Sequence, residues 1–211
     1  MKKVLWLLLV FIMATVFTSC GSKGDALYEE GVQAYTDGDY ELSMEKMKEA
    51  LEQGVSDQID KSDLYAFIGG ASLETGDIAQ AIDYYTKALE EDDSNVRNYV
   101  NLAISYRQDG DLNKAKELYL QASEIDPDYA ELNSSLGSLF IIEGDPTAAI
   151  EYFNKAIKAD PNLAVAWGNC ALAYAMTGDF EKADAYLNTS MQKGYENAET
   201  MKQLIEEEKN R

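Results

Sequence analysis

The stretch TDGDYELS, residues 36–43, contains a Gly-Asp pair that recurs along the chain. The five copies are Gly38-Asp39, Gly76-Asp77, Gly110-Asp111, Gly144-Asp145 and Gly178-Asp179. The last four are spaced by 34 residues, and the first lies 38 residues before the second. Apolar residues recur at three- and four-residue spacing on both sides of the pairs, which predicts two helices joined by a turn. Glycine suits the left-handed residue that ends a helix, and aspartate accepts hydrogen bonds from the free amides that open the next.

A 34-residue period of this kind resembles the tetratricopeptide repeat family. The repeats are expected at 24–57, 62–95, 96–129, 130–163 and 164–197. The bulky fourth position of the family is matched by Tyr65, Tyr99 and Trp167, whereas Leu27 and Asn133 depart from it. Small residues stand at the eighth, twentieth and twenty-seventh positions, as expected where helices pack closely. The resemblance implies an all-α solenoid of five helix-turn-helix repeats, with the array at 27–197.

The two ends of the array have distinct sequences. Residues 198–211 place Met201, Leu204 and Ile205 on one side and charged residues on the other, which predicts a capping helix that seals the last repeat. Between the first and second repeats, the additional residues QIDK at 58–61 predict a longer helix or a loop.

The first 19 residues are typical of an export signal, with two lysines before an apolar run from Val4 to Phe17. A helix of this run would measure about 21 Å, less than the roughly 30 Å core of a bilayer. FTSC followed by GS resembles the lipobox of bacterial lipoproteins, although Phe17 stands where an aliphatic residue is typical. The resemblance implies lipidation of Cys20, a tether over 20–26 and a location at the periplasmic face of the outer membrane or at the cell surface. A cleaved signal with an unmodified thiol and an uncleaved anchor are the alternatives.

Composition excludes several classes of function. With 18 Lys and Arg against 38 Asp and Glu, the net charge of −20 repels nucleic-acid phosphates. The chain has no histidine, which excludes imidazole-based catalysis and metal binding. It also has neither a glycine-rich phosphate loop nor a nucleophile elbow. We therefore expect no catalytic residue, no metal and no cofactor, and we expect Cys170 to be a small buried core residue.

In the resembling family, the first helix of each pair lines a concave groove that commonly holds peptides or partner helices. The positions assigned to a partner groove here are Tyr35, Leu73, Arg97, Val100, Asn101, Ile104, Arg107, Ser138, Ile141, Leu172 and Met176. Arg97 and Arg107, on one predicted helix near Asn101, can receive a carboxylate or a carbonyl of a bound segment. The alternative is that the apolar residues pack on neighbouring repeats and that the arginines pair with nearby acids. Chaperone-binding members clamp a C-terminal carboxylate with lysines, and the corresponding positions here carry none, so that activity is not predicted.

Together, these features predict a membrane-anchored bacterial lipoprotein that acts as a protein–protein interaction scaffold. Its groove would bind a peptide or helix of an envelope partner and so assist complex assembly. The alternative hypothesis is a self-associating structural envelope protein without a peptide ligand. An exposed apolar groove favours the first hypothesis, because such surfaces mark interaction sites.

Overall fold

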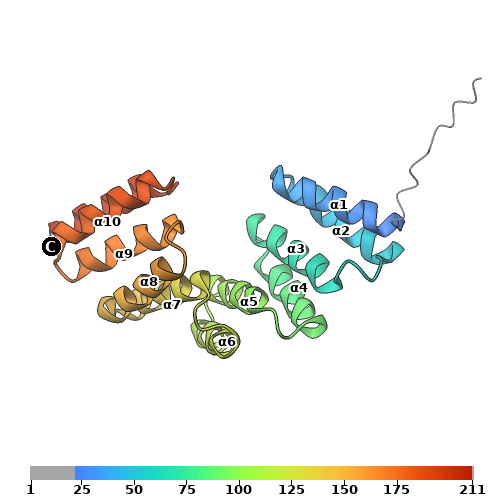
Figure 1. The fold of residues 1–211 in the computed structure, drawn as a ribbon, viewed down its shortest axis with the longest axis horizontal. Helices are drawn as coiled ribbons and strands as arrows, with labels where there is room; N and C mark the ends of the chain where they lie inside the picture. Colours follow the sequence, from blue (N-terminus) through green and yellow to red (C-terminus); the bar gives the residue numbers. More distant parts are fainter. Residues whose placement is uncertain (1–21, 211) are drawn as a thin grey trace, which may run out of the picture.

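The computed structural model describes residues 22–210, and every element within this range is a helix (Figure 1). The helices are α1 (Lys23–Thr36), α2 (Tyr40–Gln53), α3 (Lys61–Glu74), α4 (Ile78–Glu91), α5 (Val96–Asp109), α6 (Leu112–Ile125), α7 (Ala130–Glu143), α8 (Pro146–Ala159), α9 (Ala164–Met176), α10 (Phe180–Gln192) and α11 (Ala198–Lys209). This arrangement confirms the predicted solenoid of five helix pairs with a C-terminal capping helix. The predicted export signal and Cys20 lie outside the described residues.

The Gly-Asp pair forms the turn inside each repeat. All five glycines have positive φ, from 80° at Gly38 to 94° at Gly110. The following aspartate caps the next helix by accepting from the amide three residues on, as Asp111 does from Lys114 at 2.9 Å. Pro146 occupies the first turn of α8, where its missing amide hydrogen costs nothing. The chemistry predicted for this pair is therefore present in every repeat.

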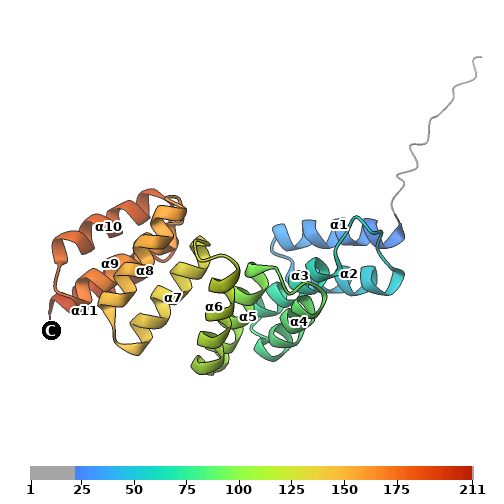
Figure 2. The same ribbon diagram turned by 60° about the horizontal axis from the view of Figure 1, so that its bottom comes forward.

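The helix pairs follow one another along a curved path (Figures 1 and 2). The odd-numbered helices from α1 to α9 contact one another in sequence, whereas no two of the even-numbered helices from α2 to α10 do so. In a curved stack, the layer whose members approach each other lies on the inside of the curve. The odd-numbered helices therefore form the concave layer, and α2, α4, α6, α8 and α10 form the outer one.

Each repeat packs a small residue of its first helix against a bulky residue of its second helix. Gly69 faces the ring of Tyr85, and Gly137 faces the ring of Phe153. A methyl group at Gly137 would lie 2.7 Å from two carbon atoms of the Phe153 ring. Only glycine permits this close approach without a shift of the neighbour. The small residues thus bring the paired helices together, as the sequence predicted.

Asn133 and Trp167 occupy the same repeat position and make the same link. The Trp167 indole Nε1 donates to the carbonyl of Pro161 at 3.0 Å. Asn133 Nδ2 donates to the carbonyl of Pro127 at 2.9 Å, also six residues earlier, and to that of Tyr129 at 3.0 Å. Asn133 departs from the bulky residue typical of this position, yet it preserves the hydrogen bond that fixes the preceding loop.

The N-terminal boundary differs from the prediction. Helix α1 begins at Lys23, because Ser22 and Asp25 form a reciprocal capping box. Asp25 also accepts a hydrogen bond from the Ser56 amide at 2.7 Å, which ties the start of α1 to the loop after α2. Residues 23–26, predicted as tether, are therefore helical. The inserted residues 58–60 lie in the loop between α2 and α3, one of the two outcomes expected for them.

At the other end, α11 packs against α9 and α10. Met201 and Ile205 are buried there, but Leu204 is 37% exposed. The prediction that all three share the buried side was wrong for Leu204. Each residue turns a helix by about 100°, so Leu204, which directly precedes Ile205, lies outside the buried stripe that Met201 and Ile205 form. None of the helices within residues 22–210 is long and apolar enough to cross a membrane.

Candidate functional site

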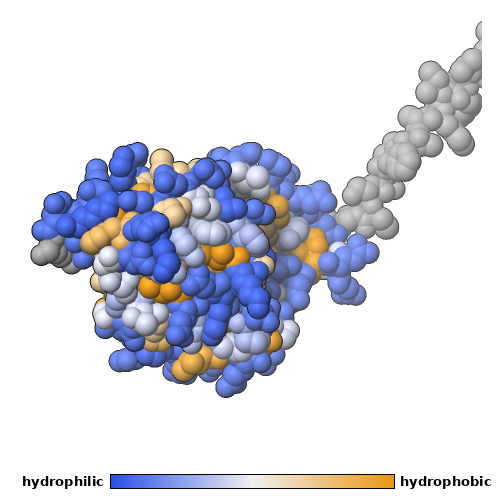
Figure 3. Space-filling view, turned by 60° about the vertical axis from the view of Figure 1, so that its left-hand side comes forward, coloured by the Kyte–Doolittle hydropathy of each residue, from blue (hydrophilic) through white to orange (hydrophobic). Residues whose placement is uncertain are grey.

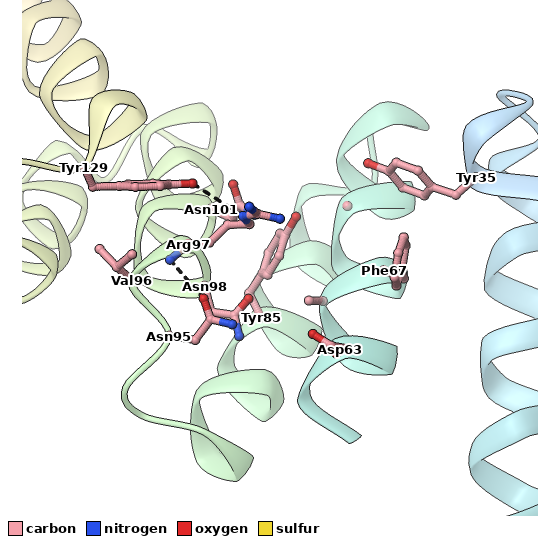
Figure 4. A pocket seen from close by; sticks show the side chains of 12 residues that line it. Tyr35, Asp63, Phe67, Tyr85, Asn95, Val96, Arg97, Asn98, Asn101 and Tyr129 are labelled. Carbon is pink, nitrogen blue, oxygen red and sulfur yellow. Dashed lines mark hydrogen bonds between the residues drawn. The ribbon is translucent and has the colours of Figure 1, made fainter. Parts of the chain in front are cut away.

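A cavity of about 480 Å³ opens on the concave layer between α3 and α5 (Figure 4). We call it the α3–α5 cavity. It also receives side chains from α1, from α4 and from Tyr129, the residue before α7. Its lining is Tyr35, Asp63, Ala66, Phe67, Gly70, Tyr85, Asn95, Val96, Arg97, Asn98, Asn101 and Tyr129. Residues from three successive repeats and the loop before the fourth thus meet at one place.

The α3 side of the cavity combines a carboxylate with aromatic rings. Asp63 lies in the first turn of α3 and is solvent-exposed at the rim. Partial burial, with the nearby carboxylates of Asp60 and Asp92, raises the pKa of Asp63, whereas Arg97 opposes the shift. One turn further along α3, the Phe67 ring packs edge-on against Tyr35, with 5.4 Å between ring centroids.

Two tyrosine hydroxyls converge above Gly70. A methyl group at this glycine would lie 2.8 Å from the Tyr35 hydroxyl oxygen and 3.3 Å from that of Tyr85. Tyr85 belongs to the outer helix α4, and its ring crosses the inner layer beside Gly69 to reach the concave side. Burial raises the pKa of both tyrosines, so both hydroxyls remain protonated and can donate at neutral pH.

The α5 side supplies hydrogen-bond donors. Arg97 Nε donates to the Tyr129 hydroxyl at 3.4 Å, and Asn101 lies one helical turn further along. Between them, Asn98 is only 1% exposed, and its buried Nδ2 donates to no atom of residues 22–210. Buried polar groups normally find a partner, because an unpaired one costs about 1–3 kcal/mol.

Two further cavities, of about 200 and 280 Å³, adjoin Arg107. Residues of α5, α7 and α9 contribute to their walls. Both are lined by Arg107, Ser138 and Asn169, and we call them the Arg107 cavities. Arg107 Nε is buried without a hydrogen-bond partner. Burial raises the pKa of the Tyr119 hydroxyl beneath it, while the guanidinium opposes that rise.

Neither Arg97 nor Arg107 forms an ion pair with any described residue. The alternative expectation, that these arginines pair with the abundant acids, is therefore not what the structure shows. All the ion pairs among residues 22–210 use lysines, such as Lys116 with Glu143 at 2.8 Å. Both arginines keep their charge available to the cavities that they line.

The structure separates the residues assigned to the partner groove into three sets. Those in the α3–α5 cavity are Tyr35, Arg97 and Asn101. Those in the Arg107 cavities are Ile104, Arg107, Ser138, Ile141 and Leu172. The remaining three are Leu73, which packs against the central core, Val100, which is 2% exposed within that core, and Met176, which is half-buried and lines none of these cavities.

Sequence reasoning missed five residues of the α3–α5 cavity that carry its chemistry: Asp63, Phe67, Tyr85, Asn98 and Tyr129. Comparison of the repeats in the sequence could have identified Asn98 as unusual. The third position of the other repeats is apolar, with Ala26, Leu64, Leu132 and Ala166. A single amide at a position that is buried in three of the other repeats, at Leu64, Leu132 and Ala166, indicates a specialised position.

Residues 22–210 contain no group of three or more metal-ligating side chains able to hold an ion. Cys170 is fully buried, as expected, and burial raises the pKa of its thiol to about 12, which keeps it protonated and unreactive.

Comparison with known proteins supports the fold. The chain resembles the solved structure of TTC0263, a thermophilic TPR protein in Thermus thermophilus, at 17% identity and a TM-score of 0.71, covering 88% of this chain and 98% of that one. It resembles pilF of Pseudomonas aeruginosa at 22% identity and a TM-score of 0.68, covering 81% and 76%. For the MamA protein the values are 20%, 0.59, 83% and 94%. No curated protein matches in sequence.

A family model described as tetratricopeptide repeat matches residues 72–139 and 140–206, which together are more than half of the chain. The matched segments include α4 to α10 whole, and the structure adds α1 and α2 with the same packing. The chain therefore belongs to the tetratricopeptide repeat family.

Proposed function

We propose that this chain is a membrane-anchored bacterial lipoprotein that acts as a scaffold, holding a peptide or helix of an envelope partner on its concave layer. Tetratricopeptide repeat proteins generally mediate protein–protein interactions. The observation that carries the proposal is a set of polar groups on α5: two arginines without an ion pair, and the buried Asn98 Nδ2 and Arg107 Nε without a hydrogen-bond partner, among residues 22–210. Arg97, Asn98 and Arg107 face cavities with apolar and aromatic walls, and no described residue pairs with either charge. Cavities with a few convergent polar groups are typical of binding sites.

The rest of the surface supports recognition through these cavities. On the face shown in Figure 3, apolar residues form small patches between hydrophilic ones. Two exposed large apolar side chains, Ile142 at 50% and Val165 at 37%, border the Arg107 cavities. We infer that a partner segment would bury these residues while its polar groups meet Arg107.

A lipid on Cys20 would determine how close the array lies to the membrane. If Cys20 is lipidated, only residues 20–22 separate the lipid from α1, a reach of about 10 Å when fully extended. Helix α1 lies at one end of the array, and the helices α5, α7 and α9, whose side chains line the Arg107 cavities, lie further along the stack (Figure 1). Removal of residues 1–19 takes away two lysines and no acid, so 16 basic and 38 acidic residues leave a charge of −22. Repulsion from anionic headgroups then favours an array that projects from the bilayer.

The decisive test is crosslinking in cells with a double variant, Ile104→Glu with Leu172→Glu. Both residues line the Arg107 cavities and are half-buried, so the new carboxylates should prevent seating of an apolar segment. We expect loss of the crosslinked partner with unchanged helical content by circular dichroism. The matched control is Leu120→Glu with Met191→Glu, on exposed positions of the outer helices α6 and α10. Equal partner capture by both double variants would refute the proposal that the partner binds at the Arg107 cavities.

Two further measurements address the remaining parts of the proposal. Metabolic labelling with a fatty-acid analogue should tag the wild type and not the Cys20→Ala variant. Equal labelling of the two would refute lipidation of Cys20. Light scattering over a wide concentration range tests self-association. A mass that rises with concentration, together with no captured partner, would favour the alternative of a structural oligomer.

A further inference from the structure

We propose that the α3–α5 cavity binds the carboxamide side chain of a glutamine in the partner segment. This inference rests on the proposed function and names the chemistry that one part of the concave layer recognises. Three features of the cavity carry it: a polar residue at a core position, hydrogen-bonding groups of both kinds, and planar walls above a deep floor.

Asn98 is the first feature. It occupies the repeat position where Leu64 and Leu132 are fully buried core residues. A leucine at 98 would bury apolar surface and need no hydrogen bond, so an amide here lowers the stability of the fold. Local rules are broken in this way mainly at functional sites. The buried Nδ2 has no acceptor among residues 22–210, and a group that enters the cavity can supply one.

The second feature is the distribution of donors and acceptors. Asn98, Asn101 and the Arg97 guanidinium present donors on the α5 side, while the Asp63 carboxylate on the α3 side is an acceptor without an ion pair. A carboxamide carries a carbonyl for the first side and an NH₂ group for the second. It also pairs with Asn98 in either orientation of the Asn98 amide, because each amide has a donor and an acceptor.

Charged ligands of similar length suit the cavity less well. A carboxylate would approach Asp63, near Asp60 and Asp92, in a chain with a net charge of −20. An ammonium group could pair with Asp63, but it would also meet the positively charged Arg97 guanidinium in the same cavity. Glutamine avoids both conflicts because it is neutral.

The third feature is depth. Asn98 is 1% exposed, so a partner main chain lying along the groove cannot reach it without descending between α3 and α5. A side chain can descend alone. The rings of Phe67, Tyr35 and Tyr85 border the path, and the glycine at position 70 leaves the space into which the two tyrosine hydroxyls converge (Figure 4). Flat rings of this kind pack well on a planar amide.

The test is a peptide titration of the ¹⁵N-labelled full-length chain in detergent, followed by nuclear magnetic resonance. The probes are acetylated and amidated peptides Ser-Ala-X-Ala-Ser, where X is Gln, Glu, Lys or Met. Methionine matches glutamine in length without its amide. We expect the Gln peptide to shift the Asn98 side-chain NH₂ signals and to bind about tenfold more tightly than the Met peptide, as hydrogen bonds at a buried site imply. Equal affinities, tighter binding of the Glu or Lys peptide, or unchanged Asn98 signals in every titration would overturn the proposal.

Variants locate the effect. Asn98→Ala should abolish the advantage of Gln over Met, whereas Asn113→Ala, at an exposed position of α6, should retain it. Asn98→Leu introduces the residue found at this position in the second and fourth repeats, and it keeps the test decisive if the alanine variant does not fold. Partner capture in cells that is lost with the Arg107-cavity double variant but unaffected by Asn98→Ala would leave the scaffold standing and refute the glutamine site alone.

Discussion

Two buried asparagines at neighbouring repeat positions are predicted to differ in how much stability the chain loses when each is truncated to alanine. Asn133 is 2% exposed and Asn98 is 1% exposed, so both side chains are equally removed from water. Asn133 donates to the carbonyls of Pro127 and Tyr129, whereas Asn98 Nδ2 donates to no described atom. The comparison therefore isolates the hydrogen bonds from the burial.

Truncation of Asn133 to alanine leaves two carbonyls of the loop before α7 without their donor. An intramolecular hydrogen bond contributes about 1 kcal/mol net, and a buried group left unpaired costs about 1–3 kcal/mol. We expect Asn133→Ala to lower the free energy of unfolding by about 2–3 kcal/mol. Asn98→Ala removes an unpaired buried donor and leaves only a small void, so we expect a change of about 1 kcal/mol or less. For a chain of this size, each kcal/mol corresponds to about 2–4 °C in melting temperature.

Urea unfolding of the full-length chain, followed by far-ultraviolet circular dichroism, measures both variants under one condition. The m-values must agree with the wild type, since a changed slope would indicate that the array no longer unfolds as one unit. A loss for Asn98→Ala as large as that for Asn133→Ala would refute the reasoning. Asn98 would then hold the fold together through its own hydrogen bonds, and the case for a ligand in the α3–α5 cavity would be lost with it.

Three further predictions follow from single sites. Gly137→Ala should destabilise the chain by about 1–2 kcal/mol in urea unfolding, because crowding against the Phe153 ring outweighs the better helix propensity of alanine; adding Phe153→Leu should restore most of the loss, and additive effects would contradict this contact. Cys170, whose pKa burial raises to about 12, should resist a disulfide reagent at pH 8 in a Cys20→Ala background and react once urea unfolds the chain; fast reaction of the folded chain would show an exposed thiol. The Ser56 amide lowers the pKa of Asp25 to about 2 from 3.8, so the unfolded chain takes up a proton at higher pH than the folded one; the resulting stability of α1 is present above about pH 4 and is lost as the pH falls towards 2. Hydrogen exchange of α1 amides should show this loss in the wild type, and persistence of the same pH dependence in Asp25→Asn would rule out its assignment to this carboxylate.

The turns and the repeat register could be predicted from the sequence because their causes are local. A positive φ at Gly110 and a capping hydrogen bond to Asp111 depend on residues that are neighbours in the chain. The same holds for Pro146 at the start of α8. The predicted start of the array at residue 27 was wrong for a reason that is partly non-local. Asp25 accepts a hydrogen bond from the amide of Ser56 as well as forming the capping box with Ser22.

The cavities were predicted only in part, because their walls come from separate repeats. Family positions on the first helices placed Arg97 and Arg107 on the concave layer, but they did not indicate that Val100 turns into the core at 2% exposure. They also gave no reason to include Tyr85, since it lies on an outer helix. That residue reaches the cavity only because two adjacent glycines, at 69 and 70, remove the side chains that would block its ring and its hydroxyl.

The packing rule of the repeat thus builds the binding site. Where a small first-helix residue meets an apolar partner, as at Gly137 and Phe153, the close approach brings an apolar ring into the core and to the wall of an Arg107 cavity. Where the partner is Tyr85, the same close approach delivers a polar group through the inner layer. A ligand in the α3–α5 cavity would contact α1, α3, α4 and α5 together with Tyr129, and so it would bridge the interfaces between successive repeats. Because solenoids are stabilised mainly by such interfaces, occupancy of the cavity should also resist separation of the stack, which joins recognition to the stability of the array.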